Sequence, residues 1–230
     1  MANMIVVMGK TGTGKSRSMK NLDPTKTYLI NCLGKDLPFR TGRADYKPEK
    51  NNYKEVNQWD EVIKTIQRIV EKRPEVNTIV IDDARYIMET EFIARANEGG
   101  YTKYTVLGQH MIAVLETART ISNKELNIYM MLHTDDVANG NTIFTYKPKL
   151  VGQLVENHFD PIELVTICLL TEVKISQKDT EYSFITNRTN INGVIIPAKS
   201  PEEMFPLSIE NDLALVNKYI HDYYKEEGVQ

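Results

Sequence analysis

Short apolar runs alternate along the chain with segments of helical period, and this alternation predicts an α/β fold with a mainly parallel sheet. Five runs have the length and composition of buried strands. They cover residues 4–8, 27–32, 78–82, 128–132 and 164–170. The last run is predicted to continue into an antiparallel hairpin with residues 182–186, turning near Lys178 and Asp179.

Helices are predicted between the strands, where apolar residues recur every three or four positions. The clearest covers residues 57–72 and ends before Pro74; shorter or less regular ones cover 15–21, 84–96, 104–122 and 209–224. Ser200, Pro201 and Glu203 have the spacing of a capping box with proline at the first helical position. They predict a short helix that ends at Pro206.

The length of 230 residues suits one domain with a modest appendage. Hydrophobic residues make up 41% and charged residues 26%, as in ordinary soluble globular proteins. We therefore expect a single domain over residues 1–230. Its core covers residues 3–190, and a C-terminal helical extension covers 200–226.

The formal net charge of −3 argues against a protein that grips nucleic acid by bulk positive charge. Cys32 and Cys168 each lie in an apolar run, so we expect two reduced core thiols and a reducing compartment. The N-terminal stretch has no basic segment, and its apolar run is too short for a signal peptide or a membrane span. These observations favour a cytoplasmic location without membrane contact.

Residues 9–16 read GKTGTGKS and match the whole phosphate-binding pattern G-x-x-x-x-G-K-[S/T]. The pattern follows an apolar strand and precedes a predicted helix, as the mechanism requires. Backbone N–H groups and the helix N-terminus would cradle a triphosphate, Lys15 would contact its β- and γ-phosphates, and Ser16 would bind Mg²⁺. The alternative is a glycine-rich turn with a solvated lysine. The predicted nucleotide-binding residues are Gly9, Lys10, Thr11, Gly12, Thr13, Gly14, Lys15, Ser16 and Arg17.

The apolar strand at 78–82 ends in two carboxylates. Asp82 has the position of a Walker B aspartate and is the second predicted Mg²⁺ ligand. Asp83 is a candidate base for polarising the attacking water. Either aspartate alternatively caps the following helix. His133 follows the fourth strand, where ligands bind in such sheets, and is a candidate γ-phosphate sensor; a partly buried structural histidine is the alternative.

Together, GKTGTGKS, TIVIDD, MMLHT and KPKLVGQLVENHFD resemble the phage-type AAA ATPases with a RecA-like core, over residues 4–188. Some members of that family assist single-strand DNA annealing and recombination. The resemblance implies ATP as the nucleotide, ATP hydrolysis, assembly into a homo-oligomer, single-stranded DNA as a partner and a phage protein acting in the host cytoplasm. It also implies a strand inserted between the Walker A and Walker B strands. The weaker later motif comprises Pro148, Leu150, Gly152 and Asp160.

One position departs from the family pattern. The family often has an acidic residue just after the second strand, where this chain has Asn31. Efficient hydrolysis therefore requires that Asp83 or Asp36 take its place.

Two polar segments are candidates for DNA contact, with solvated loops as the alternative. One is the loop at 34–55, which carries Lys35, Arg40, Arg43, Lys47, Lys50 and Lys54. The other covers residues 138–149, where aromatic residues among lysines suit base stacking and phosphate contact. It carries Phe144, Tyr146, Lys147 and Lys149. For a cation acting on a neighbouring subunit, the candidates are Arg119, Arg188 and Lys199, each alternatively an ordinary surface charge.

Three functions are therefore in competition. The first is an oligomeric ATPase acting on single-stranded DNA in recombination or replication. The second is a nucleotide kinase, which needs an arginine-rich lid; Arg85, Arg95 and Arg119 are instead scattered along the chain. The third is a nucleotide-dependent assembly switch with little hydrolysis, which the departure at Asn31 keeps open.

Overall fold

The computed structural model describes residues 1–152, 155, 158–176 and 179–226. Its central strand is β1 (Asn3–Gly9), which runs parallel to β5 (Asn127–Asn139) on one side and to β7 (Ile167–Ile175) on the other. Beyond β5 lie three further parallel strands: β4 (Thr78–Asp82), β2 (Thr27–Asn31) and β3 (Tyr53–Glu55). β5 is thus the inserted strand between the Walker A strand β1 and the Walker B strand β4.

The other edge of the sheet is antiparallel. β8 (Thr180–Ile185) forms the predicted hairpin with β7, and β11 (Ser208–Glu210) pairs with β8. A mostly parallel sheet flanked by helices, with an antiparallel hairpin on the C-terminal side, confirms the predicted fold class.

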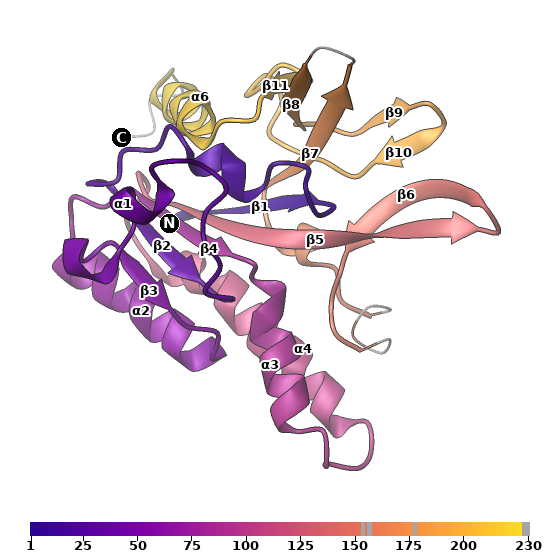
Figure 1. Ribbon diagram of the computed structural model, residues 1–230, viewed down its shortest axis with the longest axis horizontal. Helices are drawn as coiled ribbons and strands as arrows, with labels where there is room; N and C mark the ends of the chain where they lie inside the picture. The colour runs from indigo at the N-terminus through magenta and orange to yellow at the C-terminus, as the bar shows by residue number, and fades with distance from the viewer. Residues whose placement is uncertain (153–154, 156–157, 177–178, 227–230) are drawn as a thin grey trace.

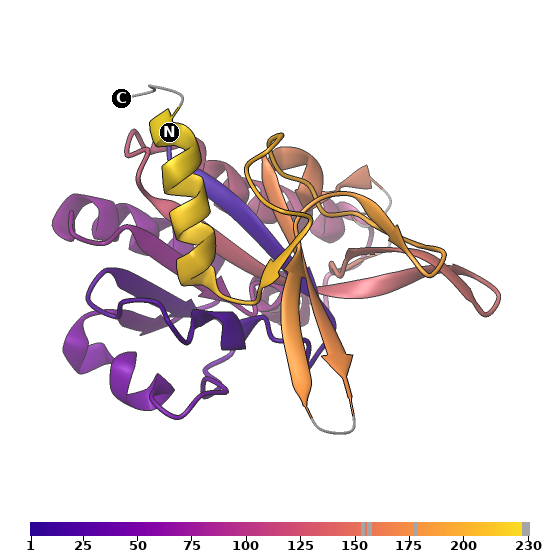
Figure 2. The same cartoon turned by 90° about the horizontal axis from the view of Figure 1, so that it is seen from above.

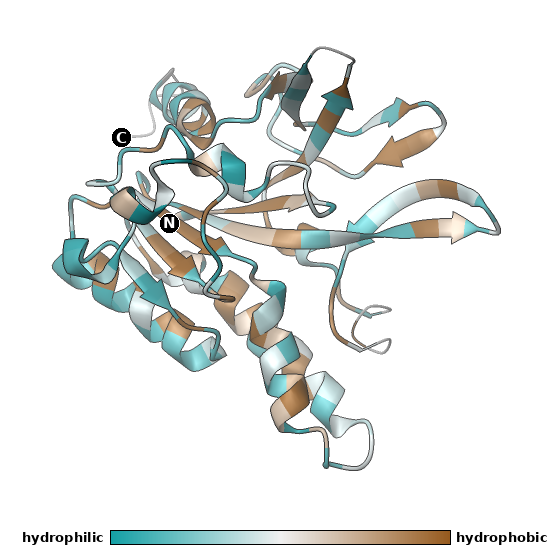
Figure 3. Cartoon of the chain, in the orientation of Figure 1, coloured by the Kyte–Doolittle hydropathy of each residue, from teal (hydrophilic) through white to brown (hydrophobic). Residues whose placement is uncertain are grey.

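Helices cover both faces of the sheet because successive strand residues point to opposite sides. Val6 and Met8 pack with α2 (Trp59–Lys72), α3 (Arg85–Ala94) and α4 (Thr102–Glu116) on one face. Ile5 and Val7 pack on the opposite face with α6 (Leu213–Glu226). Figure 1 shows the two helical layers on either side of the strands, and Figure 3 shows the apolar residues concentrated between them.

A smaller sheet extends from the main one. β5 continues past its neighbours and turns back as β6 (Thr142–Pro148), which pairs with β10 (Val194–Ile196); β10 pairs with β9 (Thr189–Ile191). We call the β5–β6 hairpin beyond His133 the β5–β6 arm. Figures 1 and 2 show this arm and the β7–β8 hairpin projecting from the body in different directions.

Several predicted elements are wrong in extent or type. The loop at 34–55 contains α1 (Gly42–Asp45), η2 (Pro48–Lys50) and β3, and the helix predicted at 104–122 divides into α4 and the 3-10 turn η3 (Thr117–Thr120). A 3-10 turn, η4 (Pro161–Leu164), precedes β7, which begins three residues later than predicted. The helix predicted at 209–224 is preceded by β11 and begins at Leu213.

The capping box at Ser200 does not open a helix. Glu203 has φ of 62°, outside the helical region, and the Ser200 hydroxyl accepts a hydrogen bond from Asn187 at 2.8 Å. The side chain that was expected to cap the helix is therefore used by a different contact, and residues 201–205 form turns.

Cys32 and Cys168 are both buried free thiols, as the sequence predicts for core residues. No helix in the described part of the chain combines the length and apolar character that crossing a bilayer requires.

Candidate functional site

The loop of residues 9–16 leaves the carboxyl end of β1, with β5 and β7 on either side. Gly12 and Gly14 have φ of 82° and 99°, a region that residues with a side chain rarely adopt. A Cβ atom on Gly14 would also lie 2.8 Å from the ring of Tyr182 in β8. The path of this loop therefore depends on glycine at both positions.

Gly9 is required for a different reason, namely its approach to β7. A Cβ atom on Gly9 would lie 1.8 Å from the hydroxyl oxygen of Thr171. That hydroxyl lies 2.5 Å from Thr13 Oγ1 and donates to the Met8 carbonyl oxygen at 3.1 Å. Thr171 thus joins the loop to β7, a contact between distant residues that the motif alone does not reveal.

The helix predicted at 15–21 is instead the 3-10 turn η1 (Ser16–Met19). At its entry, Ser18 N donates to Gly14 O at 3.0 Å in the α-helical pattern and to Lys15 O at 3.2 Å in the 3-10 pattern. A helix dipole is therefore not available here to attract an anion, and the positive character of the loop comes from its N–H groups and Lys15.

Lys15 is 7% exposed and folds back over its own loop. Its Nζ donates to the carbonyl oxygens of Gly9 at 2.7 Å and Lys10 at 2.9 Å. Burial lowers the pKa of this amine from 10.5 to about 8, against the opposing charges of Asp83 and Asp82. The amine is thus held within the loop by weak neutral acceptors, which a phosphate would readily replace.

Ser16 and Asp82 lie together although they are far apart in sequence. Ser16 Oγ donates to Asp82 Oδ1 at 3.0 Å, and the backbone N–H of Asp83 donates to the same oxygen at 3.0 Å. Burial, followed by the charge of Asp83, raises the pKa of Asp82 from 3.8 to about 6. Helix α3 has Ala84 at its N-cap with no side-chain cap, so neither aspartate has the alternative role of a helix cap.

Asp83 is buried at the mouth of the site in a left-handed backbone conformation with φ of 54°. One of its oxygens, Oδ2, lies 2.5 Å from Lys35 Nζ. The other, Oδ1, lies 3.9 Å from His133 Nδ1. The candidate base is therefore already ion-paired with Lys35, which belongs to the first of the two candidate segments for DNA contact.

His133 lies at the register position opposite Gly9, where β5 passes the phosphate-binding loop. Its pKa is lowered from 6.5 to about 4, first by burial and then by the charge of Lys15. The imidazole is therefore neutral near pH 7 and offers one donor and one acceptor to the site.

Asn31 and Asp36, at the end of the second strand and beyond it, do not form a second acidic centre. The Asn31 side chain donates to Lys35 O at 2.7 Å and accepts from Gly34 N at 2.9 Å. Asp36 is exposed and paired with Arg43. Among the described residues, Asp83 is thus the carboxylate beside Asp82, and Asn31 shapes the loop that carries Lys35.

The remaining predicted residues form the rim of the loop. Lys10 pairs with Asp136 of the β5–β6 arm at 2.8 Å, and the Arg17 guanidinium lies 4.5 Å from the ring centre of Tyr182. Thr11 is exposed at the tip. The loop is thus held at one side by the arm and at the other by the β7–β8 hairpin.

Comparison with known proteins agrees with this geometry. A family model described as an AAA domain matches residues 1–190. The chain belongs to this AAA domain family. Membership indicates a P-loop ATPase, for which nucleotide binding, usually with Mg²⁺, and hydrolysis are expected. No curated protein matches the sequence of this AAA domain.

Among solved structures, the KaiC-like protein PH0186 from the hyperthermophilic archaeon Pyrococcus horikoshii OT3 is similar at 13% sequence identity. The similarity covers 84% of this chain and 88% of that chain, with a TM-score of 0.44.

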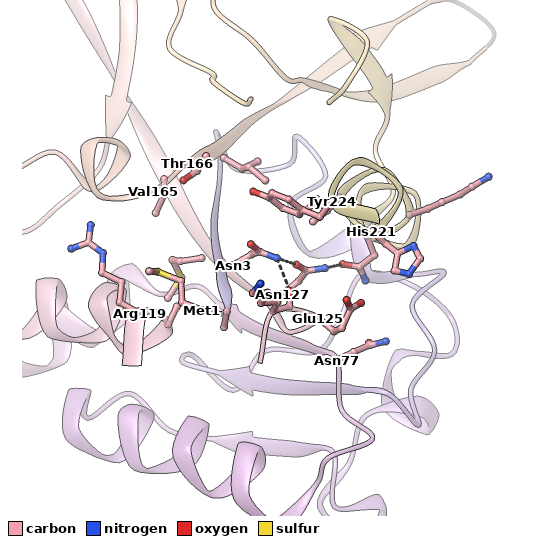
Figure 4. A pocket seen from close by; sticks show the side chains of 18 of the residues that line it. Met1, Asn3, Asn77, Arg119, Glu125, Asn127, Val165, Thr166, His221 and Tyr224 are labelled. Carbon is pink, nitrogen blue, oxygen red and sulfur yellow. Dashed lines mark hydrogen bonds between the residues drawn. The ribbon is translucent and has the colours of Figure 1, made fainter. Parts of the chain in front are cut away.

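Two pockets lie at opposite ends of β1. One of about 310 Å³ adjoins the phosphate-binding loop and is lined in part by Lys10, Thr13, Tyr146 and Glu172. The other, of about 800 Å³, surrounds the start of β1 and is shown in Figure 4. Since β1 has seven residues, about 20 Å of strand separates the two ends. The larger pocket therefore contains none of the predicted nucleotide-binding residues.

The candidate fingers lie apart from the site in their own chain. Arg119 lines the larger pocket, near Met1 and Val165 in Figure 4, and bonds Glu116 and the Leu164 carbonyl oxygen. Lys199 exchanges backbone hydrogen bonds with Cys168, and Arg188 is exposed. The printed contacts of these three residues therefore do not place them in the nucleotide-binding loop of their own chain, and a finger acting on a neighbouring subunit remains a prediction beside the alternative of an ordinary surface charge.

The later motif has structural contacts. Leu150 is buried, and Gly152 has φ of 95° with the Tyr104 ring against its Cα. Asp160 accepts from Ile162 N at 2.9 Å and so caps η4, while Pro148 ends β6. These contacts give Leu150, Gly152 and Asp160 structural roles; residues 153, 154, 156 and 157 of the same motif lie outside the described part of the chain.

The two basic segments differ from the loops that the sequence predicts. In the first, Lys35, Arg43 and Lys54 pair with Asp83, Asp36 and Glu61 respectively. The second is mostly strand β6, in which Phe144 is 47% exposed. Lys149, which directly follows β6, pairs with Asp135 at 2.8 Å. Much of the positive charge of these segments is therefore neutralised by nearby carboxylates. The exposed ring of Phe144 remains as the feature suited to stacking on a nucleobase.

Proposed function

We propose that this AAA domain binds Mg-ATP at residues 9–16 and hydrolyses it. The observation that carries the proposal is the convergence of Lys15, Ser16, Asp82 and Asp83, four polar side chains from two distant segments, at one end of β1. Burying such charges is costly, and in enzymes it is typical of a functional site. We further propose that residues 1–230 form one domain, because β11 and α6 pack on the same sheet as the core.

The donors fit a magnesium ion. Ser16 Oγ and Asp82 Oδ1 are hard oxygen ligands 3.0 Å apart, and the buried Asp82 carboxylate would be relieved of its unfavourable burial by a cation. When bound, the ion would neutralise charge on the β- and γ-phosphates. Lys15 would then exchange the carbonyl oxygens of Gly9 and Lys10 for phosphate oxygens.

In hydrolysis, a water oxygen would attack the γ-phosphorus while the bond to the β-phosphate oxygen breaks. Asp83 would orient this water and accept its proton, and neutral His133 would donate a hydrogen bond to the γ-phosphate. The support for these roles is the position of Asp83 between Asp82 and His133.

We also propose that the domain acts as a homo-oligomer on single-stranded DNA in recombination or replication, as a phage protein in the host cytoplasm. The support is the resemblance of the sequence motifs and the exposed Phe144 on the β5–β6 arm, joined to the site through the Lys10–Asp136 ion pair. Nucleotide state and DNA contact would be coupled through that pair.

The ATPase proposal is tested with the wild type and Lys15→Ala. We expect Mg-dependent ATP binding and phosphate release in the wild type, and loss of both in the variant, with circular dichroism and melting behaviour unchanged. Retained ATP affinity in folded Lys15→Ala would overturn the proposed site.

The DNA proposal is tested with Phe144→Ala, because stacking on one aromatic ring contributes about 1–3 kcal/mol per base. We expect single-stranded DNA to raise ATP turnover of the wild type and to bind Phe144→Ala about tenfold or more weakly, while turnover without DNA is unchanged. Ile175→Ala is the matched control, since Ile175 is 79% exposed on the other hairpin. Equal DNA affinity in all three proteins would refute direct contact by the arm.

An assembly switch with little hydrolysis is the second candidate, favoured by the Lys35–Asp83 ion pair that occupies the candidate base. It predicts tight binding and ATP-dependent oligomerisation with turnover near background. A kinase is disfavoured, because Arg85, Arg95 and Arg119 each pair with glutamates of their own helical segments.

A further inference from the structure

Lys35 enters the site although it belongs to neither nucleotide-binding motif. Its Nζ lies 2.5 Å from Asp83 Oδ2, and its charge also acts on Lys15 and His133. The two partners differ in freedom, since the Asp83 side chain is 4% exposed and the Lys35 side chain 55%. The lysine can therefore change its partner, whereas the aspartate remains in place.

The backbone that carries Lys35 is fixed. Asn31 bonds Gly34 N and Lys35 O, and Gly34 has φ of 71°. A Cβ atom on Gly34 would lie 2.6 Å from the Glu55 carboxylate, so the turn is closely packed as well. A fixed turn that bears one long, half-exposed side chain suits a residue that moves by rotating its own bonds.

The charges of the site favour an exchange of partners. Without nucleotide, Lys15 and Lys35 balance Asp82 and Asp83. The γ-phosphate of ATP brings negative charge, while ADP lacks this group. When Lys35 moves from Asp83 to the γ-phosphate, it exchanges one ion pair for another, so a bound triphosphate can shift the balance between the two positions of the lysine.

We propose that Lys35 is a γ-phosphate ligand of its own chain, which pairs with Asp83 in the empty site and transfers to the γ-phosphate when ATP binds, thereby freeing Asp83 to accept a proton. The proposal rests on the proposed ATPase function. It makes the candidate base available only when a triphosphate is present.

The test compares affinities for a non-hydrolysable ATP analogue and for ADP, both with Mg²⁺ and without DNA, by titration calorimetry. A hydrogen bond between charged groups contributes enough that Lys35→Ala should bind the analogue about 10- to 100-fold more weakly. ADP affinity should change less than about threefold, because ADP lacks the group that Lys35 contacts. Lys54→Ala is the control, since Lys54 lies on the same segment, is also ion-paired and lies outside the site.

A second variant separates a ligand from a structural lysine. Asp83→Asn removes the competing partner of Lys35, so analogue affinity should rise several-fold relative to ADP affinity. In the Lys35→Ala background the same substitution should have no such effect. A lysine that only holds Asp83 in position would weaken or spare both nucleotides equally, and that result would overturn the proposal.

The outcomes distinguish the two proposals. If the wild type binds neither nucleotide, the proposed ATPase function fails. If the wild type binds both but the ratio of the two affinities is unchanged in Lys35→Ala and in Asp83→Asn, only the role of Lys35 fails. If Lys35→Ala does not fold, the ratio of analogue affinity to ADP affinity is measured in Lys35→Met and in Asp83→Asn instead.

Discussion

The charged side chains of the site are buried, and the folded chain alone stabilises their charged forms only in part. Lys15, Asp82 and Asp83 are buried together. Because burial penalises charge, the pKa of Lys15 is lowered and the pKa of Asp82 is raised, and both shifts favour the neutral form of the side chain. Ionised groups in such a setting gain most from a ligand of complementary charge, here phosphates and a cation. The sequence predicted these residues from the spacing of their motifs.

Lys35 is the residue-scale feature that the sequence could not predict. Its neighbours in the chain are loop residues, and nothing in the order of residues 31–36 indicates that Nζ reaches a carboxylate 48 positions away. The same holds for Thr171 beside Gly9. Such contacts depend on which strand ends meet, and single-sequence patterns do not contain that information.

His133 leads to a prediction about pH. Burial and the charges of Lys15, Lys35 and Arg85 lower its folded pKa to about 4, against the opposing charge of Asp83, while the unfolded value is 6.5. The unfolded chain therefore binds the proton first, and stability is lost as pH falls from 6.5 to 4. The variant His133→Gln lacks this titration. Between pH 6.5 and 4 the wild type should therefore lose up to about 3 kcal/mol more unfolding free energy than the variant.

Chemical denaturation at pH 7, 5.5 and 4 measures the difference. Both proteins share every other titrating group, including Asp82, so their difference isolates the histidine. Parallel loss of stability in the two proteins would show that His133 is not held neutral by the fold.

At the scale of elements, strand ends bring the site together. β1 supplies the loop, β4 supplies Asp82, β5 supplies His133 and β7 supplies Thr171. His133 and Thr171 lie within longer strands, at or just beyond the last residue that pairs with β1. The strand at 78–82 was predicted with its observed bounds because it is a continuous apolar run. The extension of β5 was missed because beyond Leu132 the strand is mostly polar and leaves the core.

Short elements were also missed. β11 has three residues and exists because it pairs with β8, and residues 201–205 form turns because Ser200 bonds Asn187. Local signals for helix and strand are weak over such lengths, and tertiary contacts decide between the alternatives.

The contact between β1 and β7 leads to a second prediction. In Gly9→Ala, the new methyl group would overlap Thr171 Oγ1, so the strands must separate and we expect a loss of about 2–4 kcal/mol in unfolding free energy. Thr171→Ala in the same chain removes that oxygen and should recover part of the loss, although the Thr171 Cβ atom would still lie 3.1 Å away. Denaturant titrations of both single variants and the double variant give the coupling; additive losses would contradict direct overlap.

At the scale of the whole molecule, the sheet separates two possible binding regions. The phosphate-binding loop lies at one end of β1, and the larger pocket at the other is lined by Asn127 and Asn217, whose side-chain amides already bond each other. The family relationship and the loop geometry are the support for our proposal that nucleotide binds in the first region. The size of the second region alone would favour the opposite assignment.

Nucleotide binding at residues 9–16 is tested by a titration with Mg-ATP in which the backbone amide chemical shifts of the protein are followed. We expect the largest changes at the amides of residues 9–16, above all Gly12 and Gly14, while those of Asn127 and Asn217 remain nearly unchanged. Changes concentrated around the larger pocket, with residues 9–16 unaffected at saturation, would contradict binding at the loop.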